Sequence, residues 1–181
     1  MVFSCVVCIG RFQPFHWGHW AMVQAALNQG ERVIILLGSH QSRQYRQNPW
    51  TAAEREQMIR ASLSHGENEC IDCLPIPDFP SFADWSAHIH QQVTAKPTEQ
   101  VAILSYHPEG IAFFREYFPH WTYIEQPRQP HLHATDIRHA YFQGAPEPVY
   151  RAKIPAGTLA FLREFKGRSR YWELVQIYAL G

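Results

Sequence analysis

The chain has 181 residues, 46% of them hydrophobic, and its formal net charge is zero. This length suits a single domain with a sizeable core, which we predict over residues 1–181. A neutral chain is not typical of general nucleic-acid binders or of proteins that bind anionic membranes, because these carry a basic excess. The sequence has neither a secretion signal nor an apolar run long enough to span a bilayer, so we expect a cytoplasmic protein.

Predicted strands and helices alternate along the chain. Buried apolar runs predict strands at residues 2–9, 32–38, 70–76, 100–105 and 121–124. Helices are predicted between them, near residues 17–28, 51–64, 83–94 and 110–117. The helix at 51–64 has the clearest start, because Thr51 and Glu54 form a capping-box pattern. Residues 155–179 predict two further helices, split near Gly167.

This alternation predicts the fold class. We expect an α/β protein with a Rossmann-like, doubly wound parallel sheet of five strands, helices on both faces and a helical C-terminal tail at residues 155–181. Ligands of such sheets bind at the carboxyl ends of the strands, near the point where the strand order reverses. Segments 10–19, 39–50, 77–85 and 105–109 all follow strands and should lie along that edge.

The segment Gly10-Arg-Phe-Gln-Pro-Phe-His-Trp-Gly-His19 carries the clearest chemical signal. It follows a buried strand and begins a helix, and a helix start attracts phosphate. His16 and His19 share one side of the first helical turn, and Arg11 adds a forked cation. The segment lacks the Gly-Lys-Ser/Thr of a P-loop and the Gly-x-Gly-x-x-Gly of dehydrogenases. We interpret it as a polyphosphate cradle; a metal site is less consistent with it, because no third ligand stands nearby in sequence.

Four cysteines form two Cys-x-x-Cys pairs, Cys5 with Cys8 and Cys70 with Cys73. This spacing by itself would suggest a zinc site. Both pairs fall on predicted strands, where residues three apart point to opposite faces and cannot grip one metal. We therefore predict buried thiols and no protein metal site.

The first segment resembles the His-x-Gly-His signature of the nucleotidylyltransferase superfamily. Its longer form, Gly-Arg-Phe-Gln-Pro-Phe-His-x-Gly-His, is similar to that of the nicotinamide-nucleotide adenylyltransferases of archaea and their bacterial relatives. Some of those relatives carry a Nudix hydrolase domain after the adenylyltransferase domain. Because the resemblance reaches the connector at residues 165–178, where the chain then ends, we expect this chain to lack that hydrolase.

Three further segments resemble family motifs in the same order. These are Gly38-Ser-His-Gln41 with Asn48-Pro-Trp-Thr-Ala-Ala-Glu-Arg55, the loop from Asp78 to Trp85, and Leu132-His-Ala-Thr-Asp-Ile-Arg138. Each has an ordinary structural alternative: Trp85 as a core or surface aromatic residue, Thr135 as an N-cap, Arg55 and Arg138 as helix charges.

The resemblance implies transfer of AMP from ATP to nicotinamide mononucleotide (NMN), giving NAD and pyrophosphate, with Mg²⁺ arriving on ATP. The implied catalytic residues are His16, His19, Arg11 and Arg138. The implied ATP-binding residues are Gly10, Phe12, Gln13, Gly18, Ala134, Thr135 and Ile137. The implied NMN-binding residues are Ser39, Gln41, Arg46, Asp78 and Trp85. Relatives often self-associate, so we expect a homo-oligomer.

Three positions depart from the family pattern. His133 replaces a serine of the late motif, Gln47 stands where Lys or Arg is frequent, and residues 106–108 lack the usual Gly-His or Gly-Asn. Alternatives therefore stay open: a related nucleotidylyltransferase acting on nicotinic acid mononucleotide, FMN or phosphopantetheine, and a non-catalytic nucleotide sensor.

Overall fold

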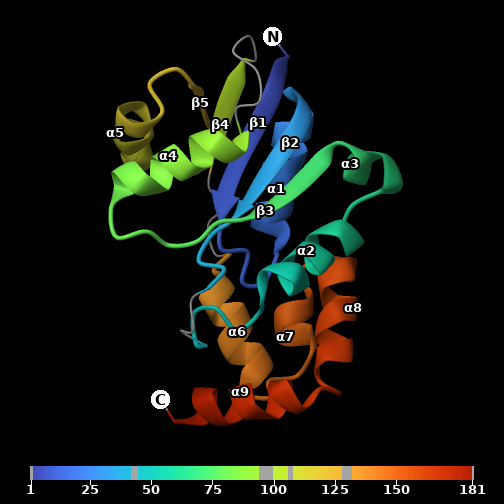
Figure 1. The fold of residues 1–181 in the computed structure, drawn as a ribbon. Coiled ribbons are helices and arrows are strands. Elements are labelled where there is room, and N and C mark those ends of the chain that lie inside the picture. Colours follow the sequence, from blue (N-terminus) through green and yellow to red (C-terminus); the bar gives the residue numbers. More distant parts are fainter. Residues whose placement is uncertain (1, 42–44, 94–99, 106–107, 128–131, 181) are drawn as a thin grey trace. The chain divides into compact units, whose positions relative to one another are not determined.

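The computed structural model describes residues 2–41, 45–93, 100–105, 108–127 and 132–180. Figure 1 shows its elements in chain order. The strands are β1 (Phe3–Gly10), β2 (Gly30–Leu37), β3 (Ile71–Pro75), β4 (Val101–Ser105) and β5 (Thr122–Glu125). The helices are α1 (Trp17–Leu27), α2 (Ala52–Ala61), α3 (His65–Glu69), α4 (Phe82–Val93), α5 (Pro108–Tyr117), α6 (Ala134–Phe142), α7 (Pro148–Arg151), α8 (Ala156–Phe165) and α9 (Ser169–Ala179).

The strands form one five-stranded sheet in the order β3-β2-β1-β4-β5, with every pairing parallel. The predicted fold class is confirmed. The order runs outward from β1 in one direction through β2 and β3, and in the other through β4 and β5. The reversal lies between β1 and β4, so the loop after β1 leaves the sheet at the place where such folds bind ligands.

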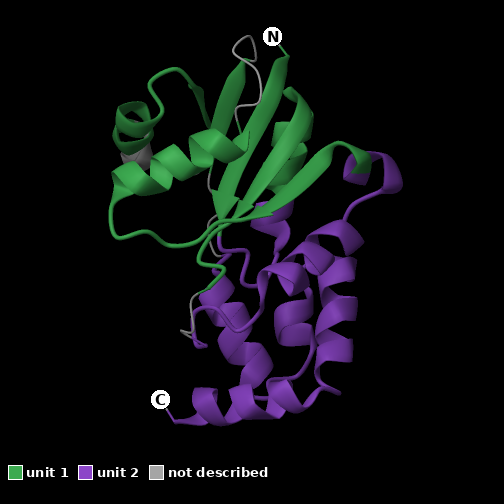
Figure 2. Cartoon of the chain, viewed as in Figure 1, with its two compact units in different colours: residues 1–10, 21–41, 69–128 green, residues 11–20, 42–68, 129–181 purple. Residues whose placement is uncertain are grey.

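Contacts within the chain divide it into two compact units (Figure 2). Unit 1 comprises residues 1–10, 21–41 and 69–128, and unit 2 comprises residues 11–20, 42–68 and 129–181. The boundary passes through α1 after Trp20. The prediction of a single functional domain over residues 1–181 stays a prediction.

Unit 1 is built around the sheet. One face buries alternate residues of the central strands, including Cys5 and Val7 of β1, against Ile89 and Val93 of α4 and Phe118 after α5. Because successive side chains of a strand point to opposite faces, Cys8 lies on the other face from Cys5. Both thiols are buried, as predicted. The prediction of a buried thiol on a strand is wrong for Cys70, which is exposed and lies just before β3, and Cys73 of β3 is only half-buried.

Unit 2 has an aromatic core formed mainly by helices. Its fully buried rings come from segments far apart in sequence: Phe12, Phe15, Trp50, Tyr141, Phe142, Tyr150 and Phe165. The predicted capping box of α2 is confirmed, since Thr51 accepts from the backbone of Glu54 and Glu54 accepts from the backbone of Thr51. The helices α3, α6 and α7 were not among the predicted elements.

Within the part of the chain that the structure describes, no helix has the length and apolar character needed to cross a membrane.

Candidate active site

The first loop (residues 11–16) joins β1 to α1 and is held by side chains of unit 2. Arg55 Nη1 donates to the carbonyl oxygen of Arg11 at 2.7 Å, and Arg138 Nη1 donates to that of Gln13 at 2.6 Å. The Gln13 amide also pairs with the backbone of Trp50, donating at 2.7 Å and accepting at 3.0 Å. Both arginines are buried. These hydrogen bonds hold the loop backbone in a single conformation. Catalysis by positioning requires such a fixed arrangement of the residues that contact the reacting groups.

His16 and His19 lie face to face at the start of α1. Their ring centroids are 3.7 Å apart and their planes differ by 17°. Phe12 and Phe15 lie next to the His19 ring, with centroids 4.7 and 6.0 Å away from it, and their own centroids are 6.4 Å apart. Spacing alone predicted that the two histidines share one side of the helix, and the structure brings them into contact.

Gly18 leaves room for this pair. A Cβ atom at this position would lie 3.0 Å from His16 Cε1 and 3.1 Å from His16 Nδ1, tighter than ordinary contacts. The backbone N–H groups of Trp17 and His19 donate to Lys153 O at 3.1 Å and to His16 Nδ1 at 3.3 Å. These two amides of the helix start therefore already have acceptors within the protein, which leaves the imidazoles as the prominent donors of this turn.

Burial keeps both imidazoles neutral. It lowers the pKa of His16 from 6.5 to about 4, with a smaller contribution from the nearby His133. Burial and then the neighbouring His16 ring lower the pKa of His19 well below 6.5. Because Nδ1 of His16 accepts a hydrogen bond, the proton of the neutral ring sits on Nε2, which can donate to an anion.

We expect acid to destabilise the protein partly through His16. With a folded pKa of about 4 and an ordinary value of 6.5, the unfolded state binds more protons between these values. The unfolding free energy therefore falls as the pH drops from 6.5 toward 4, by roughly 1.4 kcal/mol for each pKa unit of the shift. Urea unfolding at several pH values between 4 and 6.5 measures this change. The unfolding free energy of His16→Gln should vary less with pH than that of the wild-type protein. Parallel curves would show that His16 is not held neutral.

The start of α6 brings three residues of the late motif together. His133 is its N-cap and makes no side-chain cap bond, so the predicted alternative of Thr135 as N-cap is wrong. Thr135 Oγ1 instead accepts from Arg138 Nη2 at 3.0 Å. Arg138 is only 5% exposed, and its Nε donates to Arg46 O at 3.0 Å. Ala134 is half-buried in the first turn of α6 and Ile137 is buried in its interior.

Arg11 and Arg46 are exposed and have protein partners. Arg11 Nη1 donates to Gln47 Oε1 at 3.0 Å, so the residue that replaces the usual Lys or Arg pairs with the predicted catalytic cation. Arg46 donates from Nε and Nη2 to Ile177 O near the end of α9, at 3.2 and 2.9 Å. The mononucleotide role of Arg46 stays a prediction. Tyr106 and His107, two of the positions that depart from the family pattern, lie outside the described residues.

In unit 1, three of the predicted mononucleotide residues meet at the carboxyl edge of the sheet. Ser39 Oγ donates to Asp78 Oδ1 at 2.8 Å, and Gln41 Nε2 donates to Asp78 O at 3.1 Å. Gly10 lies beside them, because its carbonyl accepts from Gly38 N at 2.9 Å. Gly10 at the end of β1 therefore lies beside the segments that follow β2 and β3, as the sheet order requires.

Backbone strain marks the same loops. Among the described residues, the non-glycine positions with positive φ are Phe12 (52°) and Ser39 (53°). This left-handed region costs a residue with a side chain about 1 kcal/mol or more and persists where the surroundings enforce it. Strain of this kind clusters at functional sites, which supports a functional role for each of the two loops.

Trp85 is half-buried on α4. Its ring meets Phe118 edge to face, with centroids 5.8 Å apart, and Phe113 at 6.0 Å. The indole therefore packs on the core cluster of unit 1 while part of its surface stays accessible. This fits both the predicted stacking role and the ordinary structural one.

Two further residues of unit 2, Arg55 and Trp50, support the first loop, although the sequence indicated them only as parts of a family motif. Arg55 is fully buried and fixes the first loop through Arg11 O, while its own Nε lies 3.4 Å from Thr51 O. Trp50 is 1% exposed and stacks on Phe142, with centroids 5.5 Å apart. Neither a single charged residue in a helix, such as Arg55, nor a single aromatic residue in a polar loop, such as Trp50, produces a sequence pattern that predicts burial. The order Asn-Pro-Trp-Thr-x-x-Glu-Arg was the available clue.

Comparison with known proteins identifies the family. A model of the cytidylyltransferase-like family matches residues 7–140, most of the chain and all of the first loop. The chain belongs to the cytidylyltransferase-like family. Its matched region includes His16, His19 and Arg138.

Relatives within this family share adenylyltransferase names. The chain is 34% identical over 179 residues to the nicotinamide/nicotinic acid mononucleotide adenylyltransferase of Acinetobacter baylyi, covering 97% of this chain and 94% of the relative. It is 30% identical to the nicotinamide-nucleotide adenylyltransferase of Methanosphaerula palustris, covering 92% and 94%. The family resemblance read from the motifs is confirmed.

Solved structures agree in fold. The bifunctional NMN adenylyltransferase/ADP ribose pyrophosphatase of Francisella tularensis matches with a TM-score of 0.85 and 25% identity over 97% of this chain. A structure of that protein with AMP and a manganese ion matches equally well, at 27% identity. The chain spans about half the length of those proteins, 53% and 52%.

Proposed function

We propose that this chain transfers AMP from ATP to nicotinamide mononucleotide, giving NAD and pyrophosphate. The observation that carries the proposal is the neutral, stacked pair of His16 and His19 on a loop fixed by Arg55 and Arg138. The names of the Acinetobacter and Methanosphaerula relatives support the acceptor. These relatives match the chain over nearly their whole length.

The reaction needs positioned donors more than a base. The phosphate of the mononucleotide has a second pKa of about 6 and is already an anionic nucleophile at neutral pH. One of its oxygens forms a bond to the α-phosphorus of ATP, and the bond from that phosphorus to the bridging oxygen breaks, releasing pyrophosphate. Catalysis then consists of aligning two anions and stabilising charge on the α-phosphoryl group.

The described residues supply these functions as follows. His16 and His19 donate hydrogen bonds to the α-phosphate region without carrying charge themselves. Arg11 and Arg138 offset charge on the leaving pyrophosphate, and the uncapped start of α6 adds the favourable end of a helix dipole. In unit 1, Ser39, Asp78 and Trp85 receive the mononucleotide.

A divalent cation, Mg²⁺ in our proposal, arrives with ATP. The structure of the Francisella protein with AMP and a manganese ion supports a divalent ion in this family. Within the described part of this chain, no group of three His, Cys, Asp or Glu side chains is placed to hold a metal. The phosphates and waters would therefore provide most of its ligands, as Mg²⁺ prefers.

The acceptor class is the main alternative. The Acinetobacter relative is named for both nicotinamide and nicotinic acid mononucleotides, which differ by an amide and a carboxylate. We place nicotinamide mononucleotide first, followed by the acid form and then by FMN or phosphopantetheine. A nucleotide sensor without turnover is the non-enzymatic alternative. Self-association is a further proposal, and sedimentation of the purified protein would measure it.

The deciding experiment gives the purified protein ATP, Mg²⁺ and each acceptor in parallel, and it measures the pyrophosphate released and the adenylylated product. Turnover with nicotinamide mononucleotide above the other acceptors supports the proposal. Equal turnover with the acid form assigns dual specificity instead. Binding of ATP without turnover on any acceptor would favour the non-catalytic nucleotide sensor.

Replacing Trp85 by alanine should raise the KM for the mononucleotide by about tenfold, because one base-stacking contact contributes 1–3 kcal/mol. The KM for ATP should stay unchanged. Trp85→Phe is the matched control, since it keeps a ring against Phe118 and should recover much of the affinity. A rise confined to the KM for ATP would remove Trp85 from the mononucleotide site.

A further inference from the structure

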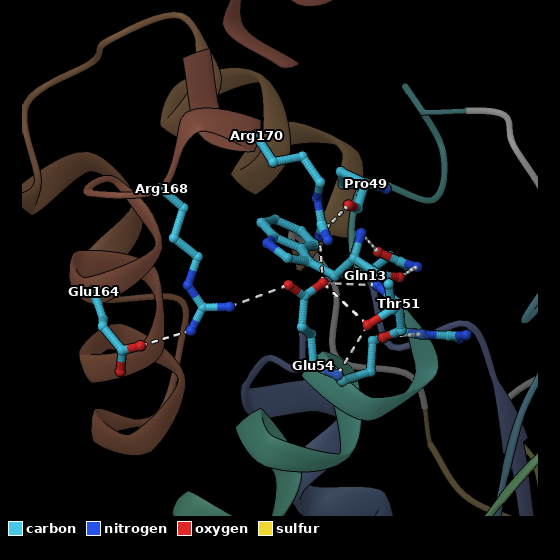
Figure 3. Close-up of polar contacts among 9 residues, drawn as sticks. Gln13, Pro49, Thr51, Glu54, Glu164, Arg168 and Arg170 are labelled. Carbon is cyan, nitrogen blue, oxygen red and sulfur yellow. Dashed lines mark hydrogen bonds and ion pairs between the residues drawn. The ribbon is translucent and has the colours of Figure 1, made fainter. Parts of the chain in front are cut away.

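Glu54 holds a buried carboxylate that receives donors from two separate parts of unit 2 (Figure 3). Its side chain is 11% exposed. Within its own helix, it accepts from Thr51 N at 2.9 Å and from Thr51 Oγ1 at 3.2 Å. From the C-terminal tail, Arg168 Nη1 approaches Oε1 at 3.4 Å and Arg170 Nη2 donates to Oε2. Capping α2 uses this carboxylate only to accept from Thr51 N, so the two arginines require a separate explanation.

The tail places these two cations where a helix disfavours them. Arg168 is the N-cap of α9 and Arg170 lies in its first turn, which holds no acidic residue. The start of a helix carries partial positive charge, so cations there are unfavourable unless an anion is near. Glu54 supplies that anion from α2. One carboxylate therefore serves the starts of two helices.

Aromatic rings and a second carboxylate fix the arginines further. The guanidinium groups of Arg168 and Arg170 lie over the Phe165 ring, at 5.6 and 5.0 Å from its centroid. Arg168 Nη2 also donates to Glu164 Oε1 at 2.6 Å. An arginine with this many partners is strongly oriented, in contrast to a typical surface ion pair.

The contacts continue from Glu54 to the first loop. Arg170 Nη2 donates to Pro49 O at 3.0 Å, so this arginine holds the segment just before α2. The next residue is Trp50, whose backbone N–H and carbonyl both form hydrogen bonds with the side-chain amide of Gln13. The backbone carbonyl of Gln13 in turn accepts from Arg138. A continuous series of hydrogen bonds therefore connects Arg170 of the tail and the Glu54 carboxylate with the first loop, which carries His16.

We propose that Glu54 is a positioning residue for adenylyl transfer, and that Arg168 and Arg170 of the tail complete its function. This inference rests on the proposed function. The tail does more than pack against the unit: it sets the position of the segment at residues 48–51 and, through Gln13, of the first loop that receives ATP. Loss of the contacts between Glu54 and the two arginines should weaken ATP binding and lower turnover, while binding of the mononucleotide by the unit 1 residues should stay unchanged.

Three variants separate this role from simple stability. Glu54→Gln keeps an acceptor that can complete the capping box but loses the charge. Arg170→Gln removes the bond to Pro49 and one ion pair. Arg163→Gln is the matched control, because Arg163 pairs with Glu147 through two bonds on the same tail without contacting this series of hydrogen bonds. All are assayed well below their unfolding midpoints.

We expect Arg170→Gln and Glu54→Gln each to raise the KM for ATP and to lower kcat by about tenfold, since small misplacements of a catalytic loop are costly. The KM for nicotinamide mononucleotide should stay within about twofold, and Arg163→Gln should change every constant by no more than that. The double variant Glu54→Gln/Arg170→Gln should lose less than the product of the two single effects, because both single variants remove the same Glu54–Arg170 pair while each also loses a contact of its own.

Several results would overturn the proposal. One is a fall in the unfolding midpoint with unchanged KM and kcat, and another is an equal rise of KM for both substrates. Multiplying effects in the double variant would show that the two residues act independently. If the wild-type protein forms no dinucleotide, the proposed function fails, and the dissociation constant of ATP with Mg²⁺ becomes the readout. Weaker binding by Arg170→Gln than by Arg163→Gln then supports the positioning role, and equal binding overturns it.

Discussion

Replacing His19 by alanine is expected to lower kcat for NAD formation by about 10²- to 10³-fold, the usual cost of removing one preorganised donor to a developing charge. The imidazole packs against the rings of His16, Phe12 and Phe15, so its orientation is fixed before substrate binds. The KM for the mononucleotide should change little, because the loss falls on the transition state. Steady-state kinetics with ATP and mononucleotide each varied in turn measure both constants.

Two further variants make this result specific. His19→Asn keeps an uncharged N–H donor and should recover part of the lost turnover, since the native ring is neutral. His139→Ala removes an exposed histidine of α6 whose ring meets only the edge of Tyr178 among the contacts described, and it should leave kcat unchanged. Full turnover in His19→Ala would remove this residue from the mechanism.

Replacing Gly157 by alanine is expected to destabilise the protein by about 3 kcal/mol or more, at or above the upper end for overpacking. A Cβ atom there would lie 2.1 Å from the carbonyl oxygen of Ala61 and 2.6 Å from the backbone nitrogen of Ser62. These are backbone atoms at the end of α2, so no rotamer change relieves the overlap. The start of α8 would have to move away from α2.

Urea unfolding of Gly157→Ala and Gly66→Ala checks this expectation. Gly66 lies in α3 and a Cβ atom there would have nothing within 4 Å. Its replacement should be neutral or stabilising by about 0.5–1 kcal/mol, because alanine favours a helix over glycine. Similar stability in both variants would show that α2 and α8 are not packed as closely as the structure places them.

The centre of the sheet was predictable because β1, β2 and β4 contain continuous apolar runs, as strands buried on both faces require. The capping box of α2 was predictable because its signal lies within four residues. The helix α6 was missed because its N-cap, His133, is not a residue type that favours helix starts and makes no side-chain cap bond. The four-residue α7 is too short for a periodic signal.

The candidate site shows the same limit. Spacing placed His16 and His19 on one side of a helix, but a ring separation of 3.7 Å and the loss of their charge come from tertiary burial. Likewise, nothing local indicated that Arg170, 116 residues away in sequence, meets the carboxylate of Glu54. Long-range pairing of single side chains leaves no pattern in a lone sequence.

The division of the chain into two units has an evolutionary consequence. The residues proposed for the polyphosphate belong to unit 2 apart from Gly10. Four of the five predicted mononucleotide residues, Ser39, Gln41, Asp78 and Trp85, belong to unit 1, and the fifth, Arg46, belongs to unit 2. Their hydrogen bonds run within their own unit. Substitutions that retune the acceptor can therefore accumulate in unit 1 while the donor half of the chemistry is inherited unchanged. A lineage organised in this way can exchange one acceptor for another without rebuilding its means of activating ATP.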